Sequence, residues 1–255
     1  LAPAEEPSVS KQLERAYKKR GIDFKLGVRF SGVEQDDHGV KVSLESGETL
    51  EADLLLVAVG RGPVTQGLGF EEAGIKMERG FVIVDEKLET SVPGVYAIGD
   101  ITPGLQLAHR SYQHGIFVAE QIAGQNPVMV PDINIPKITY CTPEIASVGL
   151  KEADAKQQYG DDKISSYEYN LAGNAKSSIL GTAGSVKVVR VNDGPVVGVH
   201  MIGARVGELV SEAQLIVNWE AYPEDVAQLI HAHPTQGETI GEAHMALAGR
   251  PLHAL

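Results

Sequence analysis

The sequence predicts an α/β fold in which the end of a Rossmann-like nucleotide-binding domain and a central segment precede an antiparallel α+β domain. Short alternating strands lead into six uninterrupted apolar residues at 54–59. Such a run is typical of a strand buried on both faces of a parallel sheet. After about residue 131, strands are followed by helices without βαβ alternation, which indicates an antiparallel α+β domain. With 255 residues and 43% hydrophobic content, the chain can build more than one core.

The first sixty residues predict one helix and a small meander. We expect the helix over residues 8–20, where Ser8 can cap the N-terminus and Gly21 follows the C-terminus. Strands are expected over residues 22–26, 40–44 and 49–52, and the alternation in the second indicates one face open to water. The basic stretch 15–20 falls at the C-terminal end of the helix, where positive charge complements the helix dipole. We therefore expect a solvated helix end there.

Two polar or glycine-rich stretches follow the predicted buried strands. Gly60 ends the apolar run, and parallel sheets bind ligands beyond the carboxyl ends of their strands, where glycine permits close backbone approach. The stretch 60–63 can equally be an ordinary turn, and its residues leave both interpretations open. A second buried strand is expected over residues 95–98, and Asp100 beyond it could accept hydrogen bonds from sugar-like hydroxyl groups. A long helix is expected over residues 106–123.

The C-terminal half predicts a mixture of short strands and helices. The turn at residues 192–195 separates two alternating runs and is typical of a hairpin. The expected strands cover residues 138–140, 146–150, 185–191 and 196–202, and the expected helices cover 152–159, 208–218, 223–230 and 235–248.

The run from His231 to Glu238 is the strongest candidate for chemistry. Histidine exchanges protons near neutrality, and a carboxylate against one ring nitrogen sets the tautomer and raises the basicity of the other. Thr235 and Glu238 also have the spacing of a capping box at the start of a helix. Spacing alone leaves a catalytic pair and a structural helix start as alternatives.

Composition excludes several classes of function. The formal charge of −12 and a pI near 5.1 disfavour nucleic-acid binding. The sequence contains no run of 18 apolar residues, so we expect no membrane-spanning helix, and no signal peptide is recognisable. The single cysteine, Cys141, rules out an internal disulfide framework and fits a reducing cytoplasm. Because the chain begins with Leu1, we expect an excerpt of a longer protein.

Four separated motifs occur in a characteristic order. They are the stretches 57–61, 96–100 with 107–109, 140–144, and 231–235 with Glu238. Together they resemble the flavin-dependent pyridine nucleotide–disulfide oxidoreductases over essentially the whole chain. The resemblance implies that residues 1–62 end an NAD-binding domain, residues 63–130 form a central FAD-contacting segment, and residues 131–255 form a dimerisation domain.

The resemblance also assigns roles to individual residues. His233 would be the proton-transferring base, Glu238 its orienting partner, and His231 a packing or supporting residue. Cys141 would be a small buried hydrophobic residue outside the redox centre, and no metal site is expected. The cofactor-binding residues would be Asp100, Gln106, Leu107, Ala108 and His109 for FAD, with Gly60 and Phe30 for NAD.

Within this family the chain is most similar to the enzymes that oxidise dihydrolipoamide to lipoamide with NAD. The resemblance implies a homodimer that acts on a lipoyl carrier domain of a 2-oxo acid dehydrogenase complex. The alternatives are another disulfide reductase, glutathione reductase-like, or a non-catalytic dimerisation fragment. A mercuric reductase would carry a C-terminal cysteine pair, and the tail has none.

The chain also departs from the family pattern. It has no Gly-x-Gly-x-x-Gly motif and no second cysteine, and residues 113–115 lack the acidic residue that is common there. We therefore expect the C-terminal portion of an enzyme that is inactive alone, with its redox disulfide outside this chain. Residues from about 131 onward should fold and dimerise best, whereas residues 54–59 should leave an exposed strand edge.

Overall fold

The structure is a computed structural model that describes residues 1–254. It divides into two compact units. Unit 1 combines residues 1–23 with the segment from Val130 to the C-terminus, and unit 2 is Phe24–Met129. This division does not test the three predicted domains, which remain a prediction. It does show that the first helix belongs to the same unit as the C-terminal half.

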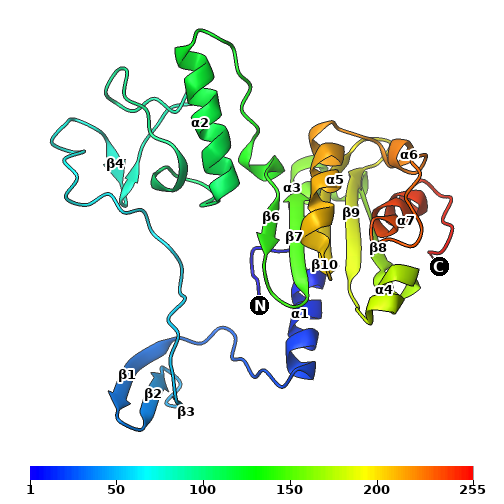
Figure 1. The fold of residues 1–255 in the computed structure, drawn as a ribbon, viewed down its shortest axis with the longest axis horizontal. Helices are drawn as coiled ribbons and strands as arrows, with labels where there is room; N and C mark the ends of the chain where they lie inside the picture. The colour runs from blue at the N-terminus through cyan, green and yellow to red at the C-terminus, as the bar shows by residue number, and fades with distance from the viewer. Residues whose placement is uncertain (255) are drawn as a thin grey trace. The chain divides into compact units, whose positions relative to one another are not determined.

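The centre of unit 1 is a five-stranded sheet in which every neighbouring pair is antiparallel (Figure 1). Its spatial order is β6-β7-β10-β9-β8. The strands are β6 (Lys137–Thr139), β7 (Glu144–Gly149), β8 (Ile164–Asn170), β9 (Ser185–Val191) and β10 (Val196–Gly203). This sheet confirms the antiparallel α+β domain predicted from the sequence.

Helices cover both faces of this sheet. The helices of unit 1 are α1 (Pro7–Lys19), α3 (Glu152–Tyr159), α4 (Ala175–Leu180), α5 (Val206–Asn218), α6 (Pro223–Val226) and α7 (Glu238–Leu247). Helices α5 and α7 pack on the face that presents Val188 and Met201, both completely buried. Because side chains alternate along a strand, Ile145 and Ile202 lie on the opposite face, where they pack against α1. Short 3-10 turns, η2 (Asp132–Asn134), η3 (Asp161–Lys163) and η4 (Leu171–Gly173), complete the unit.

A buried ionic cluster joins the residues before α1 to the sheet. Lys187 Nζ lies 2.7 Å from a carboxylate oxygen of Glu6 and 2.7 Å from one of Glu152. Ser147 Oγ donates to Glu5 Oε2 at 2.7 Å. The hydrogen bonds from Lys156 and Lys187 lower the pKa of Glu152 to about 2. The N-terminal segment is therefore held to the sheet by charge as well as by apolar packing.

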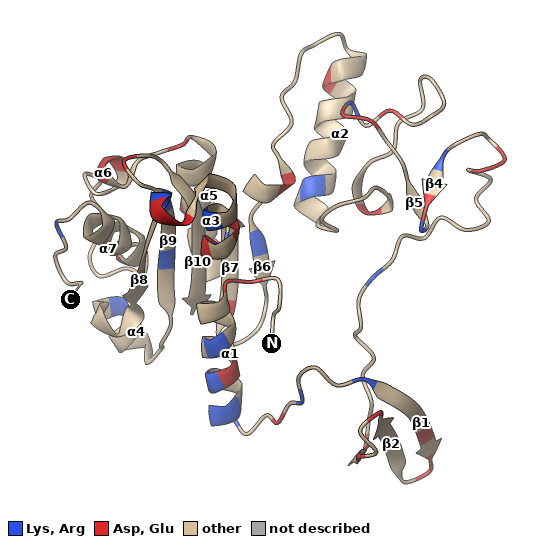
Figure 2. Ribbon diagram, turned by 180° about the vertical axis from the view of Figure 1, so that it is seen from behind, with Lys and Arg blue, Asp and Glu red and all other residues tan. Residues whose placement is uncertain are grey.

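The end of α1 is solvated, as the basic stretch predicts. Figure 2 shows several lysine and arginine positions along the ribbon of α1. Lys18 and Lys19 are exposed in its last turn. Arg20 follows, lies 5.8 Å from the ring centre of Tyr17, and donates to Thr142 O at 3.0 Å.

Unit 2 contains a meander, a two-stranded ribbon and one long helix. Its elements are β1 (Phe30–Asp36), β2 (Gly39–Leu44), β3 (Thr49–Ala52), β4 (Met77–Glu78), β5 (Phe81–Val82), η1 (Gly99–Ile101) and α2 (Ala108–Ile122). The meander confirms the strands expected near residues 40–44 and 49–52. The strand expected over residues 22–26 is wrong, because β2 pairs instead with β1 across the tight turn before Gly39.

Two predicted buried strands of unit 2 are absent. Residues 54–59 form no strand, and the side chains of Leu54 and Leu56 are both 86% exposed. Residues 95–98 make only an isolated bridge, from Tyr96 to Glu89, and Ala97 alone among them is buried. A strand requires a neighbour for its N–H and C=O groups, and no described segment of residues 1–254 provides one for residues 54–59.

Unit 1 differs from the prediction in smaller ways. Helix α6 ends at Val226 rather than at residue 230, and the apolar side chains of Leu229 and Ile230 are exposed, so a longer helix would bury nothing. Helix α7 begins at Glu238 rather than at Thr235. Strand β8 and helix α4 were not predicted. No helix among residues 1–254 has both the length and the apolar character needed to span a membrane.

Candidate active site

The His233–Glu238 pair forms where the turn before α7 meets the first residue of that helix. His233 Nδ1 lies 2.8 Å from Glu238 Oε1. Because an ionised carboxylate can only accept, Nδ1 carries the hydrogen and Nε2 presents a lone pair. The His233 side chain is 68% exposed and that of Glu238 is 20% exposed. No hydrogen bond within residues 1–254 occupies Nε2. The pair thus has the form of an oriented base.

Glu238 also supports the backbone of the turn. Its Oε2 accepts the N–H of Thr235 at 2.8 Å, which is the reciprocal bond of a capping box. The other half is missing, since Thr235 Oγ1 donates to Ala232 O. Burial opposes the charge of Glu238, but the hydrogen bonds from Thr235 and His233 outweigh it and lower the pKa. The predicted capping box is therefore not formed, because α7 begins at Glu238 with Gly237 before it, and the Glu238 carboxylate holds both the His233 ring and the turn.

Helix α4 and the residue before it hold the turn in place. Asn174 Nδ2 donates to Thr235 O at 3.0 Å, and Gln236 Nε2 donates to Ser177 Oγ at 3.1 Å. Asn174 also caps α4, because its Oδ1 accepts the N–H of Ser177. The sequence analysis missed these supports. Asn174 before α4 has the residue type that typically caps a helix, but nothing in the sequence indicates that its side chain also contacts Thr235.

His231 is held in a different environment from His233. Its Nε2 lies 2.7 Å from Glu212 Oε1, on α5, and this hydrogen bond raises the pKa of His231. The ring also lies against α7, where a Cβ added to Gly241 would be 2.7 Å from His231 Nδ1. His231 is half-buried between two helices. Glu212 is a further site neighbour that the sequence analysis did not identify.

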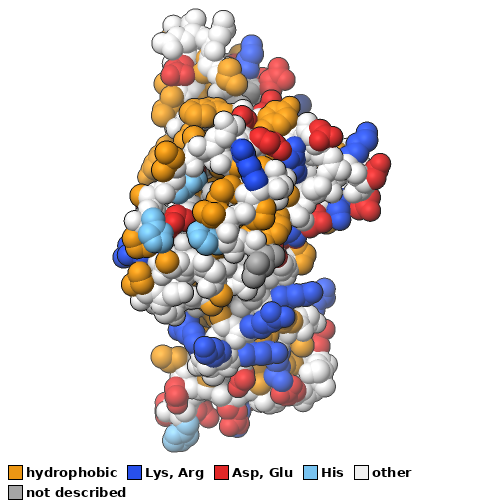
Figure 3. All heavy atoms as spheres, turned by 90° about the vertical axis from the view of Figure 1, so that its right-hand side faces the viewer, with side chains coloured by type: hydrophobic (Ala, Val, Ile, Leu, Met, Phe, Trp, Pro, Cys, Tyr) orange, Lys and Arg blue, Asp and Glu red, His pale blue; other side chains and the backbone are white. Residues whose placement is uncertain are grey.

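A second histidine–carboxylate pair lies beside the first. His253 Nδ1 lies 2.7 Å from Glu242 Oε1, and the backbone N–H of His253 donates to Glu242 Oε2 at 3.0 Å. A cavity of about 250 Å³ is lined by both pairs and by Tyr169 and Asn174. Figure 3 shows histidine side chains gathered beside acidic atoms on the face where α7 and the C-terminus lie in Figure 1. The sequence analysis did not identify this second pair. The four-residue spacing of Glu238 and Glu242 could have indicated that the two carboxylates lie on one face of a helix.

The predicted FAD-contacting residues lie around the start of α2 in unit 2. Gln106 Nε2 donates to Asp100 O at 3.2 Å, and Gly99 lies so close to α2 that an added Cβ would be 2.7 Å from Ser111 Oγ. The side chain of Asp100 is exposed. Leu107 precedes the helix, and Ala108 and His109 begin it. The structure therefore brings these residues of unit 2 together.

This arrangement has the chemistry that a flavin nucleotide requires. Leu107, the residue before α2, makes no side-chain hydrogen bond to the first turn of the helix. The exposed carboxylate of Asp100 can accept a hydrogen bond from a sugar-type hydroxyl group. The residues present therefore fit the expected cofactor.

The remaining predicted residues are more scattered. Phe30 begins β1 with an exposed ring, and Gly60 lies in the extended stretch after β3 with φ of 130°. No hydrogen bond among residues 1–254 joins these two. Cys141 is half-buried, its Sγ lies 3.0 Å from Pro143 O, and burial raises the pKa of its thiol. A raised thiol pKa disfavours the reactive thiolate.

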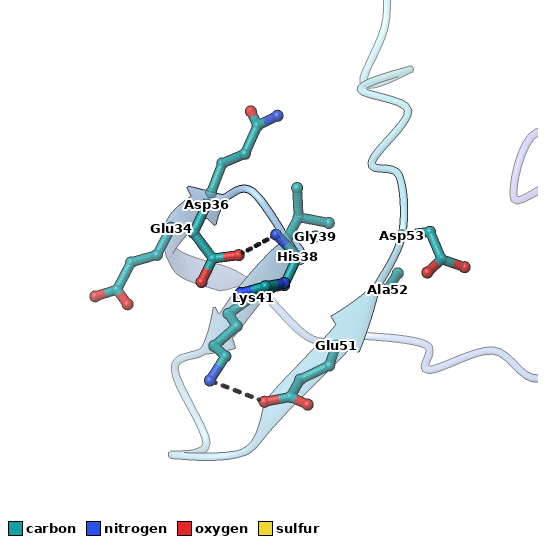
Figure 4. A pocket seen from close by; sticks show the side chains of 10 residues that line it. Glu34, Asp36, His38, Gly39, Lys41, Glu51, Ala52 and Asp53 are labelled. Carbon is teal, nitrogen blue, oxygen red and sulfur yellow. Dashed lines mark hydrogen bonds and ion pairs between the residues drawn. The ribbon is translucent and has the colours of Figure 1, made fainter.

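A separate hollow of about 670 Å³ lies on the meander of unit 2. Figure 4 shows acidic side chains around it, with Lys41 paired to Glu51 at 3.1 Å. No group of three or more histidine, cysteine or acidic residues among residues 1–254 is arranged to hold a metal ion. The acidic side chains of this hollow therefore give no metal site.

Comparison with known proteins assigns the family. Residues 1–115 match the family described as pyridine nucleotide-disulphide oxidoreductase, and residues 135–244 match its dimerisation domain. The chain belongs to this family. Its similarity within the family is to dihydrolipoyl dehydrogenases. It is 37% identical to mitochondrial dihydrolipoyl dehydrogenase 2 of Arabidopsis thaliana over 99% of the chain, and 38% identical to the dihydrolipoyl dehydrogenase of Bacillus subtilis over 99%.

Solved structures give the same result for the fold. LpdA from Mycobacterium tuberculosis matches 96% of the chain with a TM-score of 0.89 and 27% identity. The chain covers 54% of that structure, and 51% and 54% of the two dihydrolipoyl dehydrogenases. The chain thus spans about half the length of the relatives that it matches.

Proposed function

We propose that this chain is part of a flavin-dependent dehydrogenase that oxidises dihydrolipoamide to lipoamide with NAD as the acceptor. The observation that carries the proposal is the His233–Glu238 pair, in which Nδ1 is held by the carboxylate and Nε2 is open. Similarity to dihydrolipoyl dehydrogenases over 99% of the chain supports the choice of substrate.

His233 acts as the base for the substrate thiol. A thiolate rather than a thiol attacks a disulfide, so removal of the thiol proton activates the substrate. His233 takes this proton at Nε2, while Glu238 keeps the ring oriented and stabilises the imidazolium that forms. The disulfide that accepts the electrons belongs to the whole protein rather than to this chain, whose single cysteine is Cys141.

Asp100, Gln106, Leu107, Ala108 and His109 hold FAD, and Gly60 and Phe30 approach NAD. When bound, FAD supplies the two-electron transfer between the dithiol and NAD. Asp100 binds a ribityl hydroxyl group, and the start of α2 meets the flavin nucleotide. The exposed carboxylate of Asp100 and the hydrogen bond between Gln106 and Asp100 support this assignment.

The whole protein forms a homodimer and takes its substrate from a lipoyl carrier domain of a 2-oxo acid dehydrogenase complex. The dimerisation-domain match supports the first part, as do the exposed side chains of Trp219, Leu229 and Ile230 in unit 1. Residues 1–62, 63–130 and 131–255 serve as the end of the NAD domain, the flavin-contacting segment and the dimerisation domain. The single cysteine supports a reducing compartment such as the cytoplasm.

Substitution of the proposed base in the full-length holoenzyme tests this function. We expect H233Q to lower kcat for dihydrolipoamide oxidation about 10²–10⁴-fold, because general base catalysis contributes about that much. The measurement is NADH formation by absorbance, with flavin content recorded for each variant. The H38Q variant is the matched control, since His38 lies on the meander in unit 2, and it should keep wild-type turnover.

Two results would overturn the proposal. Near-normal turnover of H233Q would show that the histidine is only structural. A wild-type enzyme that ignores dihydrolipoamide but reduces glutathione disulfide would favour the glutathione reductase-like alternative. A flavoprotein disulfide reductase of Escherichia coli, 25% identical with a TM-score of 0.88, supports only the broader class of disulfide reductases.

A further inference from the structure

The second histidine–carboxylate pair repeats the geometry of the first. In each pair a glutamate Oε1 lies within 2.8 Å of a histidine Nδ1, while the other oxygen accepts a backbone N–H. The His253 side chain is 60% exposed over a Glu242 side chain that is 5% exposed. In the His233–Glu238 pair, an exposed ring likewise lies over a carboxylate that is half-buried.

Helix α7 brings the two pairs together. Glu238 and Glu242 are four residues apart and therefore lie on one face of the helix, one turn from each other. The two rings reach this face from different segments, one from the turn before α7 and the other from the chain after it. Both line the cavity of about 250 Å³. No hydrogen bond within residues 1–254 reaches Nε2 of His253, so its lone pair is open.

The other titratable side chain that lines this cavity keeps its proton. Tyr169, on β8, is 3% exposed, and burial, with the charges of Glu242 and Glu238, raises its pKa to about 12. Tyr169 is therefore a hydroxyl donor at neutral pH and accepts no proton. Both oxygens of Glu238 and of Glu242 already accept hydrogen bonds, so the imidazoles of His233 and His253 are the proton acceptors with an open lone pair at this cavity.

We propose that His253 is a second proton acceptor of this site, held by Glu242 as His233 is held by Glu238. The inference rests on the proposed oxidation of a dithiol. Such a substrate loses two S–H protons and two electrons as its S–S bond forms. The electrons break the S–S bond of the redox disulfide of the whole protein and leave two thiolates there. One proton passes to Nε2 of His233 and the other to Nε2 of His253, and both then leave to solvent.

The test is turnover of H253Q in the full-length holoenzyme, with and without added imidazole. Glutamine keeps a hydrogen-bond donor beside Glu242 but cannot accept the proton. We expect kcat to fall about tenfold or more with KM nearly unchanged, because proton transfer contributes at least that much. Added imidazole should restore kcat in proportion to its concentration. It should have no such effect on the H38Q control or on the wild type.

The outcomes separate this inference from the proposed function. Wild-type turnover of dihydrolipoamide with an unimpaired H253Q variant would overturn the second acceptor and leave the function intact. A loss of turnover that imidazole does not restore would assign His253 a structural role and would also overturn it. A wild-type holoenzyme without dihydrolipoamide activity would overturn both. The melting temperature of H253Q, compared with H38Q, distinguishes a folding defect from a catalytic one.

Discussion

Strand β9 in unit 1 and residues 54–59 in unit 2 are both rich in apolar residues, yet the valines of β9 are buried and residues 54–59 are exposed. In β9, Val186, Val188 and Val189 are completely buried between two neighbouring strands and the covering helices. In residues 54–59, Leu54 and Leu56 are almost fully exposed and no described strand pairs with them. An apolar segment therefore requires neighbouring strands or helices to be buried, but its own sequence does not show whether such neighbours are present.

Unit 1 also uses charge to secure a segment that is distant in sequence. Lys187 projects from β9 to Glu6, which precedes α1, and to Glu152, which begins α3. A cation buried between two carboxylates is costly to leave unpaired. The stretch 54–59 has only exposed apolar side chains, and no such contact secures it among the described residues. The comparison predicts that unit 1 is sensitive to this one side chain.

The largest expected effect is that of K187A. Loss of the cation leaves Glu6 buried without its ionic partner, and breaking a buried pair in this way costs about 3–5 kcal/mol. Urea unfolding followed by the fluorescence of Trp219 measures the change, because this single tryptophan lies in unit 1. The control K163A removes an exposed lysine and should change the free energy of unfolding by less than about 0.5 kcal/mol. Equal effects of the two variants would contradict the role of the cluster.

Acid should weaken the same cluster. The pKa of Glu152 is lowered from an ordinary value of 4.5 to about 2, first by Lys156 and then by Lys187. A lowered pKa in the folded state stabilises the protein above pH 4.5, and this stabilisation is lost as the pH falls through 2. This shift corresponds to at most about 3 kcal/mol, and partial exposure of Glu152 to solvent reduces the expected loss from unit 1 to about 2 kcal/mol. In E152Q this part of the pH dependence should disappear, and an unchanged pH profile would contradict the assignment.

Local patterns predicted most of unit 1. The bounds of β9 and α3 agree with the prediction, because alternation and a nearby turn or cap define them within a few residues. Strand β8 was missed because the consecutive Ser165 and Ser166 break the alternation of apolar and polar residues, and its partner lies about twenty residues further along. The strand predicted for residues 54–59 is wrong even though the residues are apolar, because strand formation depends on pairing with other segments.

The candidate site shows the same limit. The spacing of five residues between His233 and Glu238 could be detected in the sequence, and the structure joins their side chains. His253 lies 11 residues after Glu242, and His231 lies 19 residues after Glu212. The first contact requires the chain to turn back on α7 and the second requires it to return to α5, and no local pattern encodes either return. Tertiary packing therefore supplies two of these three histidine–carboxylate contacts.

The smallest expected effect tests the comparison most directly, with one substitution made in each run. V188A removes two methyl groups from a completely buried position in β9 and should cost about 2 kcal/mol. In calorimetry this corresponds to a melting temperature lower by about 4–8 °C. V57A removes the same atoms from a side chain that is 67% exposed, so its melting temperature should change by about 1 °C or less. If V57A is destabilised as much as V188A, residues 54–59 are packed against a neighbour in solution, and the contrast between the two runs fails.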